Sequence, residues 1–202
     1  MNPNKQKSSF STHIGRIARE TIATSVCVWI CIVACHRQTD VAQGQARSAL
    51  EVRSSDFVNG GSIPQRFTCD GADASPDLQW SDPPAGTRSI ALVMHDPDAL
   101  IDFTHWLVFN IPPEGRSLGE GSSRRSSMPE GSVEGANDFD RPGYGGPCPP
   151  GSKPHHYVFH LYALDIRLNL PAGATKKDLT SAIRGHVLTE GQIVGTYKHG
   201  GQ

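Results

Sequence analysis

One segment, residues 143–165, constrains the fold more than any other part of the chain. It reads Gly-Tyr-Gly-Gly-Pro-Cys-Pro-Pro-Gly-Ser-Lys-Pro-His-His-Tyr-Val-Phe-His-Leu-Tyr-Ala-Leu-Asp. Its first half is rich in glycine and proline, which favours a stiff loop with few backbone donors and close approach of neighbouring groups. From His155 onward, apolar and β-favouring residues predict a strand over residues 155–164. A stiff loop, a pair of histidines and a buried strand together predict the rim of a pocket.

The remainder of the chain beyond residue 50 consists of short candidate strands separated by turns. Residues 89–94 and 105–111 are predicted to form buried strands, and residues 50–53 and 192–197 weaker ones. The 202 residues include 21 Gly and 15 Pro, so the chain is long enough for one sizeable core and rich in turns. This pattern predicts a mostly β fold, an antiparallel β-sandwich with a few short peripheral helices.

One helix is predicted near the C-terminus. Thr175 is a suitable N-cap, and Leu179, Ile183 and Val187 recur every four residues, with Gly191 beyond them. We therefore expect a helix that begins after Thr175 and continues as far as Val187. The Gly- and Ser-rich residues 117–135 predict a surface loop with a short strand near Met128.

The N-terminus predicts export. Lysines and arginines precede an apolar run over residues 21–34, which ends Ile32-Val33-Ala34-Cys35. The run is shorter than the roughly 20 residues of a transmembrane helix, and its pattern is typical of a signal peptide. We predict a signal peptide with a lipobox at residues 1–34, acylation of Cys35, a flexible tether at residues 35–50 and a folded domain at residues 51–202. An ordinary signal peptide with an incidental cysteine is one alternative, and an uncleaved anchor is another. The predicted location is the periplasmic side of the cell envelope, through a lipid anchor.

The charge distribution argues against one class of partner. The net charge is −1, and the sequence contains no basic stripe. Nucleic-acid binding leaves an electrostatic footprint of clustered Lys and Arg. No nucleic-acid partner is therefore expected.

Four motifs together resemble a known family. They are the sequences Phe-Thr-Cys-Asp-Gly at residues 67–71, Asp-Pro-Asp-Ala at 96–99, His-Trp-Leu-Val-Phe-Asn-Ile-Pro at 105–112, and Gly-Pro-Cys-Pro-Pro followed by His-His-Tyr at 146–157. Over about residues 54–197 the chain resembles the phosphatidylethanolamine-binding proteins, in particular the bacterial branch labelled Raf kinase inhibitor-like. One departure is Leu100, where the family usually has proline.

The resemblance implies a ligand pocket. The residues it assigns to the pocket are Asp96, Asp98, His105, His155 and Tyr157, with Pro149 and Pro150 as its wall. An aspartate beside a histidine can hold one ring N–H and also favours the protonated imidazole. Cationic imidazoles and a tyrosine hydroxyl could then bind phosphate, sulfate or carboxylate. Asp98 could equally serve as a turn former, and structural roles are expected for the histidines at positions 95, 156 and 160.

The function that this resemblance implies is binding rather than catalysis. We expect a membrane-tethered protein that binds a small anion or a phosphorylated head group and modulates a partner kinase or protease. One alternative function is that of an interaction protein whose pocket is vestigial.

The cysteines leave two possibilities open. Cys27 and Cys31 lie in the apolar N-terminal run, and Cys35 is the predicted lipid site, which leaves Cys69 and Cys148. These two either form a disulfide, in a compartment that permits one, or remain as buried free thiols. A sequence does not supply the Cα separation that would decide between them.

The sequence gives little sign of a catalytic or metal motif. No Gly-x-Ser-x-Gly elbow occurs, and prolines flank Cys148, the one thiol near His155. His156 and His160 lie about 13 Å apart if they occupy one strand, too far for one ion. We therefore predict no catalytic residue, metal site or cofactor. A hydrolase or metal-dependent enzyme that uses the same His/Asp pocket remains the alternative.

Overall fold

The computed structural model describes residues 49–125 and 127–200, which belong to the unit Arg47–Gln202. The predicted signal peptide, Cys35 and nearly all of the predicted tether lie outside the described residues. Within the described ranges, no helix combines the length and the hydropathy needed to cross a membrane.

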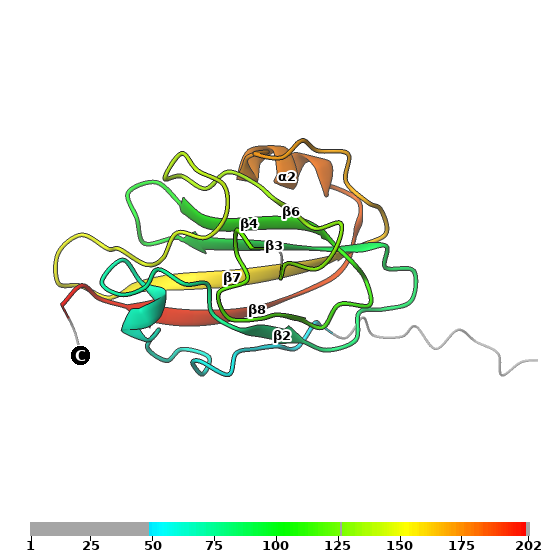
Figure 1. Ribbon diagram of the computed structural model, residues 1–202. Helices are drawn as coiled ribbons and strands as arrows, with labels where there is room; N and C mark the ends of the chain where they lie inside the picture. Colours follow the sequence, from blue (N-terminus) through cyan, green and yellow to red (C-terminus); the bar gives the residue numbers. More distant parts are fainter. Residues whose placement is uncertain (1–48, 126, 201–202) are drawn as a thin grey trace, which may run out of the picture. The chain divides into compact units, whose positions relative to one another are not determined.

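The folded unit contains two antiparallel sheets (Figure 1). The large sheet has the order β6 (Val133–Glu134), β4 (Phe103–Ile111), β3 (Ser89–Asp96), β7 (His155–Leu164) and β8 (Val187–Tyr197). The small sheet has the order β1 (Val52–Arg53), β2 (Leu78–Trp80) and β5 (Ser117–Leu118). A 3-10 turn, η1, covers Gln65–Phe67. The predicted antiparallel β-sandwich is confirmed.

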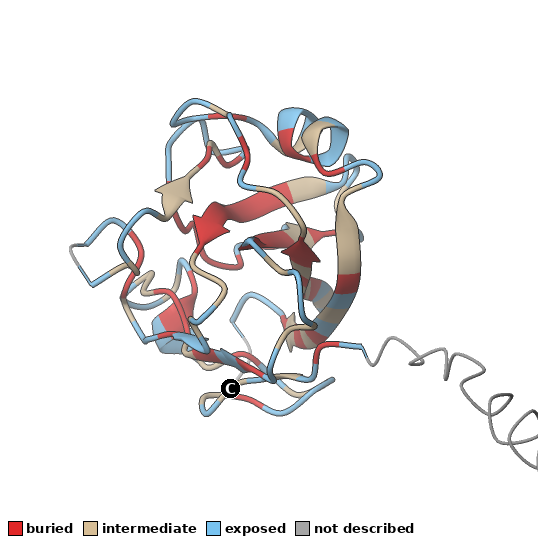
Figure 2. Cartoon of the chain, turned by 90° about the vertical axis from the view of Figure 1, so that its right-hand side faces the viewer, coloured by how far each residue is buried: buried red, intermediate tan, exposed pale blue. Residues whose placement is uncertain are grey.

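The main core lies between the two sheets. Alternate residues of β7, namely Tyr157, Phe159 and Leu161, are fully buried in the same cluster as Leu78 and Trp80 of β2. This alternation follows from the two-residue period of a strand, in which successive side chains point to opposite faces. Figure 2 shows the buried residues largely on the strands and the exposed ones largely on the connecting loops.

The central strand β3 is buried on both faces. Leu92 and Met94 join the core between the sheets, whereas Ala91 and Val93 join a second cluster that includes Leu179 of the helix α2 (Lys176–Ala182). A strand with both faces covered is expected to be apolar at nearly every position, and Ser89–Met94 fits that expectation.

The helix begins as predicted but ends earlier. Thr175 and Asp178 form a capping box at its N-terminus. The expectation that the helix continues to Val187 is wrong, because Gly185 adopts a positive φ of 82° and Val187 pairs with Leu164 as the first residue of β8. Backbone pairing with β7 outweighs the four-residue spacing of apolar side chains.

The loop over residues 117–135 also differs from the expectation. No strand forms at Met128, which lies in a turn; instead the segment contributes β5 at its start and β6 near its end. β6 pairs with Val108 and Phe109 of β4, so tertiary pairing creates a strand that local composition did not indicate.

The strand directions bring several chain segments to one end of the large sheet. Asp96 at the end of β3 pairs with Phe103 at the start of β4, and the register of β7 with β8 places His155 opposite Tyr197. The C-terminal ends of β3 and β8 therefore meet the N-terminal ends of β4 and β7. The predicted pocket residues all come from this end or from the loop that precedes β7.

Candidate functional site

Asp96 is the buried anchor of the site. Asp96 is only 3% exposed, and both oxygens of its carboxylate make hydrogen bonds. Oδ1 accepts hydrogen bonds from the backbone N–H groups of Asp98, at 2.9 Å, and Ala99, at 3.2 Å. Oδ2 lies 2.7 Å from Nδ1 of His155. The carboxylate is thereby fixed in position, and its negative charge is opposed by three donors.

His155 is oriented by this carboxylate. Its Nδ1–H is donated to Asp96, and Nε2 makes no hydrogen bond to any residue that the structure describes. The side chain remains 12% exposed. An imidazole held at Nδ1 presents Nε2 in a defined direction, as an acceptor when neutral and as a donor when protonated. His155 can therefore bind a ligand through Nε2.

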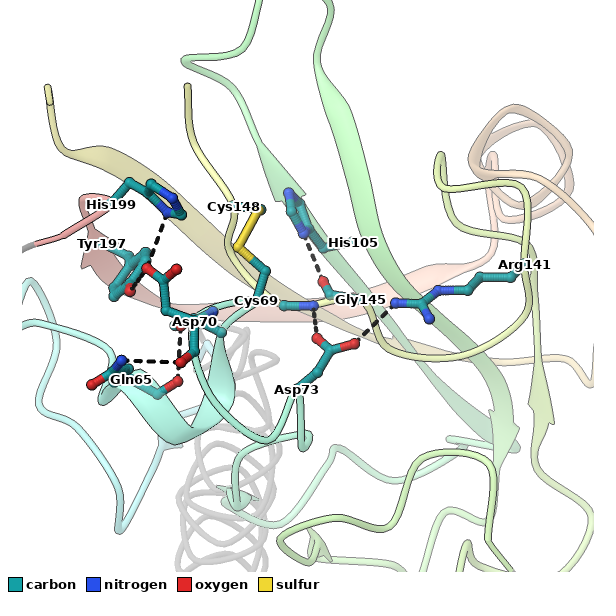
Figure 3. Close-up of a disulfide and its surroundings, with 12 residues drawn as sticks. Gln65, Cys69, Asp70, Asp73, His105, Arg141, Gly145, Cys148, Tyr197 and His199 are labelled. Atoms are coloured by element: carbon teal, nitrogen blue, oxygen red, sulfur yellow. Dashed lines mark hydrogen bonds and ion pairs between the residues drawn. A yellow bond between two sulfur atoms is a disulfide. The ribbon is translucent and has the colours of Figure 1, made fainter. Parts of the chain in front are cut away.

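His105 is anchored differently, by a backbone carbonyl. Its Nδ1 lies 2.7 Å from the oxygen of Gly145, and the N–H of Gly145 is donated in return to the His105 carbonyl at 2.9 Å. Because a carbonyl can only accept, Nδ1 carries the proton and Nε2 of the neutral ring has a free lone pair. Figure 3 shows the His105–Gly145 contact from β4 to the loop.

Burial lowers the pKa of His105, and it outweighs the opposing effects of the Gly145 carbonyl and the Asp96 carboxylate. The Asp96 charge does favour the protonated ring, as expected, but burial has the larger effect, so the expected cationic form is not favoured at His105. Desolvation disfavours the charged ring in a residue that is only 3% exposed. His105 is neutral near neutral pH.

Tyr157 supplies a buried hydroxyl. Its residue is fully buried, and its ring lies edge-on to His105 with the ring centroids 5.1 Å apart. Burial, and secondly the Asp96 charge, raise the pKa of Tyr157 well above its usual value, so the phenol keeps its proton. Asp96 and the Cys148 backbone are its polar neighbours, but the hydroxyl makes no hydrogen bond of normal geometry to a described residue. Such a buried donor is uncommon and requires an explanation.

Asp98 lies at the rim and pairs with the neighbouring histidine. Its Oδ2 accepts from the backbone N–H of His156 at 2.8 Å and lies 2.7 Å from the His156 Nδ1. These two bonds lower the pKa of Asp98. Both side chains are substantially exposed. Asp98 thus connects the loop after β3 to the start of β7, and its Oδ1 has no side-chain hydrogen bond within the part of the chain that the structure describes.

The other two histidines for which structural roles were expected also have partners. His95 pairs with Asp102, and Nδ1 of His160 lies 3.0 Å from the Tyr162 hydroxyl. His160 also lies on the strand face opposite Tyr157, because strand neighbours separated by an odd number of positions face opposite ways.

The loop before β7 is attached to the core at several points. The Tyr144 hydroxyl is donated to the Phe67 carbonyl at 2.6 Å, the Gly146 N–H to Asp73 Oδ1 at 2.6 Å, and the Cys69 N–H to the Pro147 carbonyl at 3.1 Å. In the same loop Pro149 is buried and Pro150 is exposed. The loop that carries the predicted wall is therefore well fixed.

A disulfide joins Cys69 to Cys148, with their Cα atoms 5.5 Å apart (Figure 3). Of the two possibilities that the sequence leaves open, the structure contains the bridge. Both residues are exposed, in contrast to the buried thiols of the alternative. The bond links the segment after η1 to the loop before β7.

Sequence reasoning missed three groups near His105. Rings of Phe103 and Phe139 lie 5.1 Å and 5.4 Å from the His105 ring, and Phe139 is 39% exposed. The sequence could have indicated Phe103, since it is two residues from His105 and therefore lies on the same strand face. The Gly145 carbonyl has none, because every residue carries a carbonyl.

The fold and this arrangement define a β-sandwich with a polar cluster at one end of the larger sheet. A comparison with known proteins agrees: the model of the phosphatidylethanolamine-binding protein family matches residues 53–198. The chain therefore belongs to the phosphatidylethanolamine-binding protein family.

Individual relatives support this assignment. A "UPF0098 protein" of Methanothermobacter thermautotrophicus is 45% identical over 152 residues, which cover 75% of this chain and 100% of the relative. The "Putative lipoprotein LppC" of Mycobacterium tuberculosis is 41% identical, over 76% of this chain and 74% of its own. The crystal structure of Escherichia coli YbcL, described as a member of the mammalian PEBP family, matches with a TM-score of 0.71 at 32% identity, over 75% of this chain and 99% of that one.

Proposed function

We propose that this protein binds a small anion, such as the phosphate of a phosphorylated head group, at the site formed by Asp96, His105, His155 and Tyr157. One observation carries the proposal. Both histidines are anchored through Nδ1 by acceptors inside the fold, at 2.7 Å each, so that both Nε2 atoms and the buried Tyr157 hydroxyl have unused hydrogen-bonding capacity. Small-ligand sites commonly combine an apolar wall with a few convergent polar groups of this kind.

The three groups differ in what they offer to a ligand. The Tyr157 hydroxyl is a donor, and His155 becomes a second donor when its ring is protonated. Neutral His105 offers a lone pair at Nε2, which matches a phosphate oxygen that still carries a proton. A phosphomonoester loses its second proton at a pKa of about 6, so a monoprotonated form is accessible under mild conditions. The site therefore suits a partly protonated phosphate better than a fully ionised one.

The acidic side chains do not prevent anion binding. Both oxygens of Asp96 are occupied by donors, and Asp98 is paired with His156. A carboxylate in this position acts mainly by orienting the imidazole. Asp96 is thus a positioning residue for His155 in this proposal.

A hydrolase is the second candidate, and one observation favours it. The Asp96–His155 pair has the orienter–base arrangement on which hydrolases rely. Among the described residues, however, no serine, threonine or cysteine is hydrogen-bonded to His155 Nε2, and Cys148 is in a disulfide. A water molecule would have to serve as nucleophile, so we regard binding as the better-supported function.

Calorimetric titration of phosphoethanolamine tests the proposal. We expect His155→Ala to weaken binding by about 1.5–3 kcal/mol, the usual value of a charge-assisted hydrogen bond. Asp96→Asn should also weaken binding, although it removes a negative charge, because His155 loses its orienting carboxylate. The matched control is His186→Ala, which removes a partly exposed histidine paired with Asp165 at 2.9 Å at the opposite end of β7. This control should bind like the wild type.

Three outcomes would contradict the proposal. Tighter binding by Asp96→Asn would mean that simple charge repulsion governs the site. Affinity that does not change in His155→Ala would place the ligand elsewhere. Turnover of a phosphoester that is lost in His155→Ala would establish the hydrolase instead.

The proposal includes export and a lipid anchor at Cys35. It is supported by the basic and apolar N-terminal pattern that ends Ile32-Val33-Ala34-Cys35 and by the relative whose name contains the word lipoprotein. We expect Cys35→Ser to abolish labelling by fatty acid and to release the protein from the membrane fraction. Unchanged labelling and fractionation in that variant would remove the lipid anchor from the proposal.

Modulation of a partner kinase or protease is the last element of the proposal, and it follows from the family resemblance alone. Such a partner could recognise the ligand-bound site or bind elsewhere on the protein, and substitutions in the proposed anion site distinguish these two cases. A partner that recognises the ligand-bound site should lose affinity in His155→Ala, whereas a partner that binds elsewhere should not.

A further inference from the structure

We propose that, once the disulfide is reduced, Cys69, Cys148 and His199 form a binding site for a thiophilic divalent cation such as Zn²⁺. The donor atoms of these three residues lie within 4.8 Å of one another. Tetrahedral zinc with bonds of about 2.0–2.3 Å places its ligands roughly 3.5–3.8 Å apart, so the two sulfurs, which are bonded in the oxidised chain, have to move apart after reduction, whereas the histidine nitrogen already lies close to them. This site is outside the proposed anion pocket and does not depend on it.

The fold itself brings the three residues together. His155 pairs with Tyr197, so the residues just beyond β8 lie beside the loop just before β7. The Cys69 N–H is donated to the Pro147 carbonyl at 3.1 Å, which holds the segment after η1 against the same loop. Figure 3 shows His199 and Cys148 approaching from these two neighbouring segments, with Cys69 below them. Three segments distant in the sequence thus place their donors at one point.

A carboxylate already orients the histidine as in a metal site. Nδ1 of His199 lies 3.0 Å from Oδ2 of Asp70, and the Tyr197 hydroxyl is donated to the same oxygen. Metal-binding histidines commonly donate their second ring N–H to a carboxylate, which fixes the ring and raises its basicity. With Nδ1–H directed at Asp70, Nε2 of His199 is the atom left to bind the cation.

The redox step has a simple balance. A dithiol reductant transfers two electrons and two protons to the S–S bond, which yields two thiols while the dithiol becomes a disulfide. Zn²⁺ then binds the two thiolates and displaces two protons to solvent. Water completes the tetrahedral set beside the two sulfurs and the imidazole. Because all three residues are exposed, both the dithiol and the cation have access.

The consequence is an exchange of one cross-link for another. In the oxidised protein each sulfur is bonded to the other, so no thiolate is available. In the reduced protein the cation joins the same two segments that the disulfide joined. The loop before β7, which also carries Gly145 and Pro149, therefore stays attached to the segment after η1 in both redox states.

The experiment uses the full-length chain with serine at positions 27, 31 and 35, so that Cys69 and Cys148 are its only cysteines. Co²⁺ is titrated into oxidised and dithiol-reduced protein, and thiolate-to-cobalt charge-transfer absorption is recorded. Zn²⁺ affinity is then obtained by competition with a chromophoric chelator. We expect one cation per reduced chain and no charge-transfer absorption from the oxidised chain.

Two variants assign the third ligand. His199→Ala should lower the Zn²⁺ affinity of the reduced chain at least about tenfold, given that even the loss of a supporting residue around a metal typically costs 10–100-fold. His199→Ala retains the disulfide, so its fold can be verified before reduction. His156→Ala is the matched control, because His156 is an exposed histidine at the same end of the sheet that pairs with Asp98. Its affinity should equal that of the parent chain.

The proposal is overturned if reduction leaves Zn²⁺ affinity unchanged, or if His199→Ala binds Zn²⁺ as tightly as the parent. A reduced parent chain that has lost its circular dichroism signal and does not regain it on addition of Zn²⁺ would also overturn it, because the site requires the folded arrangement.

Discussion

Two regions at the same end of the large sheet hold their polar groups in opposite ways. The proposed anion site, formed by Asp96, His105, His155 and Tyr157, consists of buried or mostly buried side chains, and its histidines are positioned by hydrogen bonds inside the fold. The disulfide corner, formed by Cys69, Asp70, Cys148 and His199, is largely exposed and is joined by a covalent bond. The comparison indicates that the geometry of the proposed anion site depends on buried hydrogen bonds, whereas the disulfide corner adds a covalent link at the surface of a loop whose first half is itself largely buried.

The loop at residues 143–154 belongs to both regions. On the pocket side, Gly145 exchanges two bonds with His105 and Gly146 donates to Asp73. On the corner side, Cys148 provides the cross-link. A buried bond stabilises the native state directly, since its loss leaves an unpaired polar group, whereas a disulfide acts largely by restricting the unfolded chain. Perturbing each side separately therefore tests whether the two regions are independent.

The largest effect is expected from the disulfide. The sequence separation of the two cysteines is 79 residues, a long loop to release. The double variant Cys69→Ser/Cys148→Ser should lower the free energy of unfolding by about 2–4 kcal/mol, measured by urea denaturation. Phosphoethanolamine affinity should change little, because the pocket bonds do not involve either sulfur. A tenfold loss of affinity would show instead that the corner determines the geometry of the pocket.

The next effect is expected at Gly146, on the pocket side of the loop. A Cβ at this position would lie 2.5 Å from the Phe67 carbonyl oxygen and 2.8 Å from the Thr68 Cα, both backbone atoms that cannot rotate away. Gly146→Ala should therefore destabilise the protein by about 1–3 kcal/mol with the disulfide intact. Gly119→Ala is the matched control, since its added Cβ would have no atom within 4 Å. Equal stabilities of the two variants would mean that the loop is not held tightly against η1.

The smallest effect is a pH dependence from His105. Burial lowers its pKa in the folded state, with Asp96 and Asp138 acting in the opposite direction. The unfolded chain therefore binds a proton first as pH falls below about 6.5, and stability decreases from there until the folded-state pKa is reached. We expect a loss on the order of 1 kcal/mol over that window, measured by urea denaturation at a series of pH values.

His105→Gln serves as the comparison for this measurement, because glutamine does not titrate. Its stability curve should be flatter than that of the wild type below about pH 6.5. Curves of equal slope would mean that His105 does not contribute to acid destabilisation, and that its burial in the pocket is less complete than the structure indicates.

Several elements could be predicted because their cause is local. β7 covers His155–Leu164, the same bounds that alternation and β propensity predict. Thr175 caps α2 as expected, since capping depends on residues a few positions apart. The end of α2 could not be predicted, because the pairing of Val187 with Leu164 involves a residue more than twenty positions away.

The proposed anion site also combines features that could be predicted from the sequence with features that could not. Short motifs identified Asp96, His105 and His155, and the strand directions bring them to one end of the sheet. The partner of His105 could not be predicted, because this ring is held by the Gly145 carbonyl and not by an acidic side chain. The direction of its pKa shift was consequently wrong, because desolvation depends on burial that is created only by folding.

By itself, the sequence determined the class of fold, the family motifs, the residue types available for a pocket and the pair of cysteines that could join. These properties depend on composition, periodicity and spacing along the chain. Only the tertiary structure decided where the helix ends, that Cys69 and Cys148 are bridged, which acceptor holds each imidazole, and that His199 lies beside the disulfide. Each of these depends on the distance and burial between segments far apart in the sequence, and those quantities exist only once the two sheets have packed.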